Sequence, residues 1–222
     1  MINDNLIVDP ADDFSNIEVV RGPNIKPFPL NTELQSETKG NVLLKMEDNI
    51  TTDHIMPSNA KLLPYRSNIP HLSTFCLAPV DEPFPARAKA QGGGFLVAGH
   101  NYGQGSSREH AAWAVYDYGF RCVVSSFFAD IFRNNCLNVG VLPVQVSPAF
   151  SEKIFNAIYE DPNTQIEVNL PNQTITILST GDQESFEINS YKKENMLNGF
   201  DDIDYLQNIK AEIESFANGL IM

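Results

Sequence analysis

The pattern of apolar and polar residues divides the chain into an irregular front part and a regular later part. From Gly94 onwards, short apolar runs alternate with stretches whose apolar residues recur at helical spacing, and Gly119 and Gly140 end two of these stretches. This alternation predicts β-α units with parallel strands. The elements expected here are strands at 95–98, 121–126 and 141–146 and helices at 107–118, 128–138 and 147–159.

Beyond residue 160 apolar and polar residues alternate one by one. The segments 165–170, 174–178 and 185–188 show this pattern, and the turn sequences PNQ and TGDQ separate them, which predicts an antiparallel meander. A last helix is expected at about 204–217. The whole pattern therefore predicts an α/β fold whose mixed sheet combines β-α units with an antiparallel meander.

The front part is rich in proline. Residues 1–40 are expected to be an extended leader or linker, because Pro23, Pro27 and Pro29 favour extended backbone, and residues 41–222 are expected to form the domain. The run NVLLK at 41–45 predicts a short strand. Residues 56–93 contain six prolines without sustained periodicity, so a long loop is expected there.

Charge narrows the possible partners. The 222 residues include 28 Asp and Glu against 15 Lys and Arg, a net charge of −13. A surface this acidic repels phosphate groups, so neither nucleic acid nor an anionic membrane is expected as a partner. The sequence contains no run of 18 apolar residues and begins without a signal-peptide pattern, so a cytosolic protein is expected.

The cysteines give no metal-binding pattern. Cys76, Cys122 and Cys136 are widely spaced and form no C-x-x-C pair. This spacing argues against a disulfide framework, a closed zinc site or an iron–sulfur cluster held by this chain alone. Buried, reduced thiols are expected instead.

The most informative segment is GFLVAGHNYGQGSSREH at 94–110. A strand that passes through a glycine-rich turn into a helix directs free backbone N–H groups at one point, which favours an anion, and Arg108 adds a planar donor fork. The segment lacks the third glycine of a dinucleotide fingerprint and the G-x-S-x-G of a nucleophile elbow. A purely structural alternative is that Ser106 caps the helix and Glu109 completes a capping box.

Two other segments carry polar groups in predicted loops. Thr52, Asp53 and His54 lie in DNITTDHIMP, where they could orient an arginine or a bound acid, although turns use the same residue types. Arg66 lies in the short run YRSN, and an arginine in such a loop is usually just solvated.

Taken together, NYGQGSSREHAAWA, DNITTDHIMP and YRSN resemble the C-terminal swivelling domain of the aconitase family, over about residues 17–222. The resemblance implies a swivelling β/β/α domain in which Ser106 is the catalytic base. The substrate-binding residues that it implies are Arg66, Ser107 and Arg108. Supporting roles are assigned to Thr52, Asp53, His54 and Gly105.

The resemblance also implies dehydration and rehydration chemistry. A serine removes a proton next to a carboxylate only as an alkoxide, which backbone N–H groups and a guanidinium stabilise. The departing hydroxyl needs a Lewis acid, which in this family is a four-iron four-sulfur cluster. Because this chain lacks the cysteine ligands, the cluster is expected from iron–sulfur-bearing domains, in the same longer chain or in a separate large subunit.

Two members of the family compete. An aconitate hydratase acting on citrate, a tricarboxylate of the tricarboxylic acid cycle, is preferred because Arg66 would match a third carboxylate, which is costly to bury unpaired. The alternative is the small subunit of 3-isopropylmalate dehydratase, or a homoaconitase, and the runs FADIFRNNC and LNGFDDI favour that subunit. A non-catalytic RNA-binding module is disfavoured by the net charge of −13.

Overall fold

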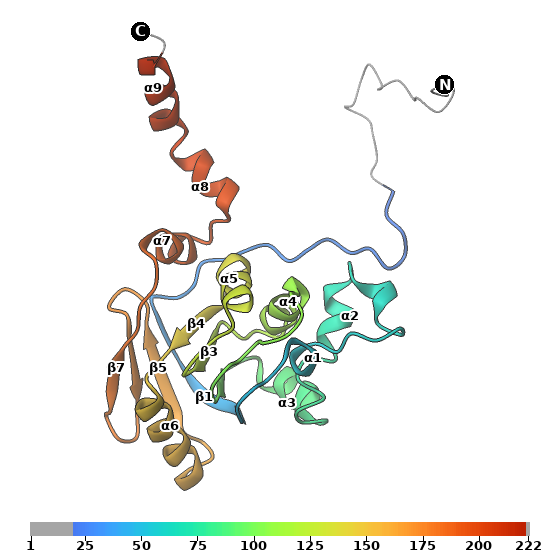
Figure 1. Ribbon diagram of the computed structural model, residues 1–222, viewed down its shortest axis with the longest axis vertical. Helices are drawn as coiled ribbons and strands as arrows, with labels where there is room; N and C mark the ends of the chain where they lie inside the picture. The colour runs from blue at the N-terminus through green and yellow to red at the C-terminus, as the bar shows by residue number, and fades with distance from the viewer. Residues whose placement is uncertain (1–19, 221–222) are drawn as a thin grey trace.

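A seven-stranded mixed sheet forms the centre of the computed structural model, which describes residues 20–220 (Figure 1). The strand order is β4-β3-β2-β1-β5-β6-β7, with β1 to β4 parallel and β5 to β7 joined antiparallel. The predicted combination of β-α units and an antiparallel meander is confirmed. The strands are β1 (Glu37–Met46), β2 (Phe95–Ala98), β3 (Cys122–Ser125), β4 (Leu142–Gln145), β5 (Gln165–Asn169), β6 (Thr174–Ile177) and β7 (Gln183–Ser185).

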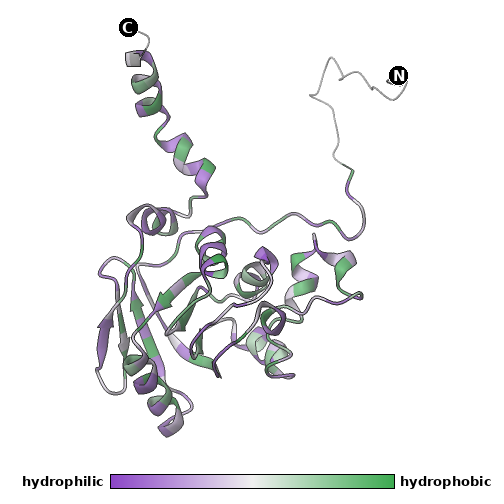
Figure 2. Ribbon diagram, viewed as in Figure 1, coloured by the Kyte–Doolittle hydropathy of each residue, from purple (hydrophilic) through white to green (hydrophobic). Residues whose placement is uncertain are grey.

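Helices cover both faces of the sheet, so β2 and β3 are buried at every position and rich in apolar residues (Figure 2). In β2, Leu96 and Ala98 belong to one hydrophobic core, whereas Phe95 and Val97 belong to the core on the opposite face. The first core includes residues of α1 (Thr52–Ile55), α2 (Ile69–Ser73), α3 (Phe84–Gln91), α4 (Glu109–Asp117) and α5 (Asp130–Val139). The second includes residues of α6 (Pro148–Glu160) and α7 (Ser190–Asn198).

The long loop expected at 56–93 contains three short helices. They are α2, α3 and the 3-10 turn η2 (Leu63–Tyr65). Pro64, Pro70 and Pro85 lie in the first turns of these helices, where the missing N–H of proline costs no hydrogen bond. The prolines therefore begin helices here instead of excluding them, and the prediction of a long loop with only isolated turns is wrong.

The start of the sheet also differs from the prediction. β1 begins at Glu37, four residues before the expected start at residue 41, and Leu34 is already buried. The division of the chain into a leader and a domain at residue 40 stays a prediction. Residues 1–19 of the expected leader lie outside the described residues.

The C-terminal region contains more helices than expected. α7 was missed because it is mostly polar. Caps mark both of its ends: Asn189 accepts from two backbone N–H groups, and Gly199 ends the helix at φ +68°. The helix expected at 204–217 is two helices, α8 (Asp202–Asn208) and α9 (Lys210–Leu220), which project from the sheet domain (Figure 1). Within residues 20–220 no helix is long and apolar enough to cross a bilayer.

Gly103 lets the segment after β2 pass close to α5. Its backbone N–H donates to the Ile50 carbonyl at 2.7 Å, and its φ is +81°. A Cβ at this position would lie 2.2 Å from Cγ of Phe132. Both the left-handed backbone and the available space therefore require glycine.

We expect Gly103→Ala to destabilise the protein much more than Gly92→Ala. Gly92 has a similar φ of +73°, but a methyl group there would meet nothing within 4 Å. Gly92→Ala should therefore cost about 1–2 kcal/mol of stability through backbone strain. Gly103→Ala should have the same strain and lose about 1–3 kcal/mol more, because its methyl group overpacks against Phe132. Urea unfolding of both variants measures the difference, and equal losses would contradict the contact with Phe132.

Candidate active site

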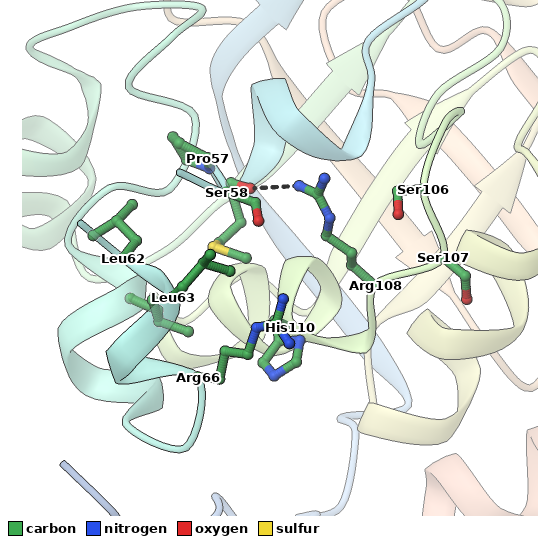
Figure 3. Close-up of a pocket in the computed structure, with 11 residues that line it drawn as sticks. Pro57, Ser58, Leu62, Leu63, Arg66, Ser106, Ser107, Arg108 and His110 are labelled. Atoms are coloured by element: carbon green, nitrogen blue, oxygen red, sulfur yellow. Dashed lines mark hydrogen bonds between the residues drawn. The ribbon is translucent and has the colours of Figure 1, made fainter. Parts of the chain in front are cut away.

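Segments that lie far apart in the sequence line one pocket of about 180 Å³, enough for about six water molecules (Figure 3). One side comes from the loop after α1, together with η2 and α2, and the other from the turn that leads into α4. The predicted catalytic and substrate-binding residues all meet here. The lining residues are Met56, Pro57, Ser58, Leu62, Leu63, Arg66, Leu72, Ser106, Ser107, Arg108 and His110.

Ser106 does not cap the helix. α4 begins at Glu109, two residues later than expected, and its N-cap residue is Arg108, with no side-chain capping bond. The capping-box interpretation is therefore wrong, and the exposed side chain of Ser106 lies at the pocket instead of at the helix start. Gly105 precedes it with φ +102°, a conformation that suits glycine.

Arg108 is fixed by a carboxylate. Its guanidinium donates to both oxygens of Asp53, with Nη1 to Oδ1 at 2.6 Å and Nη2 to Oδ2 at 3.2 Å. This ion pair holds the pKa of Asp53 below its usual value. Asp53 engages only some of the five N–H donors of the guanidinium. The remaining donors are available to a ligand, while the plane of the guanidinium is held in place.

Thr52 and His54 support the site through the backbone. The Thr52 hydroxyl donates to the Ser106 carbonyl at 3.0 Å, which fixes the turn that carries the two serines. The imidazole Nδ1 of His54 accepts from the Thr51 N–H at 3.1 Å and completes the capping box of α1. His54 is not among the lining residues of the pocket.

Arg66 and His110 lie side by side in the pocket (Figure 3). Arg66 is exposed at the end of η2, and His110 is half-buried in the first turn of α4. Burial, together with the positive charge of Arg66, lowers the pKa of His110. His110 is not among the residues predicted from the sequence, although it stands two residues after Arg108 in the same motif.

The pocket combines positive charge with an apolar wall. Arg66 and Arg108 supply two guanidinium groups. Of the three lining leucines, Leu63 is 42% exposed and supplies most of the accessible apolar surface, whereas Leu62 and Leu72 are buried behind it. A small acid with one apolar branch fits such a lining, because guanidinium groups grip carboxylates and apolar surface accepts hydrocarbon.

The thiols do not fit a metal cluster. Cys76 and Cys136 are buried in one hydrophobic core and Cys122 in the other, on the opposite face of the sheet. Burial raises the pKa of all three, that of Cys122 to about 12, so they are poor sources of thiolate ligands. No group of three or more His, Cys, Asp or Glu side chains within residues 20–220 could hold a metal ion.

Comparison with known proteins gives two family matches. Residues 79–149 match the model for the aconitase C-terminal domain, and residues 152–190 match the model LeuD_N. In solved structures, a 3-isopropylmalate dehydratase (leuD) from Methanocaldococcus jannaschii superposes with a TM-score of 0.64 at 29% identity, covering 81% of this chain and 98% of that one.

Several curated relatives are 3-isopropylmalate dehydratase small subunits. One from Cytophaga hutchinsonii is 59% identical over 124 residues, or 56% of this chain and 62% of its own length. One from Christiangramia forsetii is 53% identical over 61% of this chain and 66% of its own length. One from Karelsulcia muelleri is 39% identical over 76% of this chain and 88% of its own length. The alignments thus span less than two thirds of the first two relatives.

These relatives overturn the preferred interpretation of the sequence. They are small subunits of 3-isopropylmalate dehydratase, so the assignment of this chain to an aconitate hydratase acting on citrate is wrong. The expected role in the tricarboxylic acid cycle is therefore not supported either. The inference of a third carboxylate rests on Arg66 alone, whereas leucine side chains also line the pocket beside that arginine.

We expect Asp53→Asn to destabilise the protein in a pH-dependent way. The folded-state pKa of Asp53 lies below 3.8, the usual value of an aspartate, so the ion pair stabilises the fold above pH 3.8 and this contribution is lost as the pH falls through the lowered pKa. Because Asp53 is 58% exposed, the effect at pH 7 should be only about 0.2–1 kcal/mol.

Urea unfolding at pH 7 and at several lower pH values measures this difference from the wild type. Glu33→Gln is the matched control, because the Glu33 carboxyl makes no ion pair or hydrogen bond to another residue of the described chain. A pH-independent difference for Asp53→Asn would contradict a role of its charge.

Proposed function

The chain belongs to the family of 3-isopropylmalate dehydratase small subunits, and on this premise we propose that it supplies the substrate-binding and proton-abstracting half of a hydro-lyase. The proposed substrate is 3-isopropylmalate, a hydroxy acid with two carboxylates and one apolar branch. The observation that carries the proposal is the convergence of Ser106, Arg66 and Arg108 on one pocket with an apolar wall.

Substrate binding is assigned to the two arginines. In this proposal Arg66 and Arg108 each hold one carboxylate, and the Ser107 hydroxyl adds a hydrogen bond. The apolar branch lies against the leucine side chains of the loop 62–72. The ion pair with Asp53 supports this assignment, because an arginine of fixed orientation loses less conformational freedom when it binds.

Ser106 is assigned the role of the base. In the dehydration it removes a proton from the carbon next to a carboxylate, and in the reverse reaction it returns one. Its alkoxide requires positive charge, which the N-terminal end of α4 and the nearby guanidinium groups supply. Arg108 keeps unused N–H donors even while it is paired with Asp53, and these donors contribute to the stabilisation in this proposal.

The departing hydroxyl requires a Lewis acid that the buried thiols of the described chain do not hold. We assign it to an iron–sulfur cluster on a separate large subunit, in agreement with relatives that are named small subunits. The proposed active site is therefore formed between two chains, and this chain provides its acid-binding side.

Mixed with a cluster-bearing large subunit of 3-isopropylmalate dehydratase, the chain should turn over 3-isopropylmalate faster than citrate. Formation of the unsaturated acid, followed by its ultraviolet absorbance, measures both rates. Each subunit alone is the control and should be inactive. Turnover by this chain alone, or a preference for citrate, would refute the proposal.

In the reconstituted enzyme, Ser106→Ala should lower kcat by about 10²–10⁴-fold, the usual contribution of a general base. KM should change little, because the arginines still hold the carboxylates. The melting temperature should also stay unchanged, since the Ser106 side chain does not cap α4. Ser179→Ala, an exposed serine in a distant turn, is the matched control. A lower melting temperature with an unchanged kcat would show that the serine is only structural.

A further inference from the structure

Residues 25–34, which we call the N-terminal strap, run in extended conformation across the ends of several helices (Figure 1). At one end the Leu34 N–H donates to the Met196 carbonyl of α7 at 2.8 Å. Farther along, the Asn31 side chain donates to the Asn138 carbonyl at 3.1 Å. The strap thus spans the domain from α7 to α5 and continues over α4.

One ridge of α4 joins the strap to the pocket. His110, Trp113 and Tyr116 follow one another at intervals of three residues, so they lie along one side of the helix. His110 lies beside Arg66 in the pocket (Figure 3). Trp113 packs edge-on against Phe28, with 6.0 Å between ring centroids, and the Tyr116 hydroxyl donates to the Leu30 carbonyl at 2.7 Å.

The strap also bonds directly to the loop that carries Arg66. The Lys26 N–H donates to the carbonyl of Ser67 at 2.8 Å. Ser67 is the next residue after Arg66, so this bond fixes the backbone where the guanidinium is attached. Phe28, two residues farther along the strap, is held on Trp113 and thereby keeps Lys26 in place.

Among the residues that the structure describes, no carboxylate orients Arg66. Within residues 20–220, no ion pair or side-chain hydrogen bond holds its guanidinium, in contrast to Arg108, which Asp53 grips through two bonds. The position of Arg66 therefore depends on its backbone and on its contact with His110. A flexible loop would have to lose its freedom each time a substrate binds, which weakens binding.

We propose that the N-terminal strap positions Arg66 for substrate binding, with Lys26 and Phe28 as its positioning residues. The strap orients Arg66 through a hydrogen bond to the neighbouring backbone, whereas Asp53 orients Arg108 through an ion pair. This inference rests on the proposed function for the identity of the substrate, but the contact between strap and loop can be tested without it.

The first experiment uses hydrogen–deuterium exchange of the isolated full-length chain. Lys26→Pro removes the N–H donor and keeps an extended backbone, whereas Lys26→Ala removes the ammonium group and keeps the donor. We expect faster exchange in the loop 62–68 for Lys26→Pro and wild-type exchange for Lys26→Ala, with β2 and β3 unchanged in both. Equal exchange of the loop in both variants would overturn the proposal.

The second experiment measures kinetics in the reconstituted enzyme. Phe28→Ala should raise KM about 3–10-fold at nearly constant kcat, because a loosened Arg66 weakens ground-state and transition-state binding alike. Phe28→Tyr, which keeps the aromatic ring, should leave KM at its wild-type value. Leu30→Ala is the matched control, since this strap side chain is 83% exposed.

A fall in kcat without a change in KM, or equal effects of Phe28→Ala and Leu30→Ala, would overturn the positioning role. If the wild-type enzyme fails to turn over 3-isopropylmalate, the proposed function is wrong, and the exchange experiment still decides whether the strap orders the loop.

Discussion

The hydrogen bonds between the segment after β1 and the segment after β2 determine where the site residues lie. β1 and β2 are parallel neighbours, so their carboxyl ends open at the same edge of the sheet. There the Thr52 N–H donates to the Gln104 carbonyl at 2.9 Å, and the Thr52 hydroxyl donates to the Ser106 carbonyl at 3.0 Å. These bonds bring α1 against the turn that leads into α4. The pairing of Asp53 with Arg108 follows from this arrangement.

The two arginines of the pocket are held by different physical means. Arg108 is 18% exposed and bonded to a carboxylate, which fixes its orientation and leaves part of its charge available. Arg66 is exposed, and its surroundings are the half-buried imidazole of His110 and a loop held by backbone bonds. Two guanidinium groups therefore line the pocket, although the whole chain carries a net charge of −13.

The sequence predicted the elements whose signal is local and missed those that depend on distant contacts. The apolar runs of β2, β3 and β4 are conspicuous because helices cover both faces of the sheet. The start of α4 was placed too early, since the turn before it is held by Thr52, about fifty residues away in the sequence. The predicted site residues Arg66, Ser106, Ser107 and Arg108 do line one pocket, but only the structure pairs Asp53 with Arg108 and adds His110.

The choice between substrates shows why a residue type alone is weak evidence for specificity. An arginine in a loop matches a carboxylate, and from that match alone a third carboxylate was inferred. Specificity depends on the whole lining, because an apolar branch gains from leucine side chains whether or not an arginine stands nearby. Leu62 is buried and Leu63 is 42% exposed beside Arg66, so one short segment presents apolar surface and positive charge together. Under the proposed function, a dicarboxylate with a hydrocarbon branch would use both.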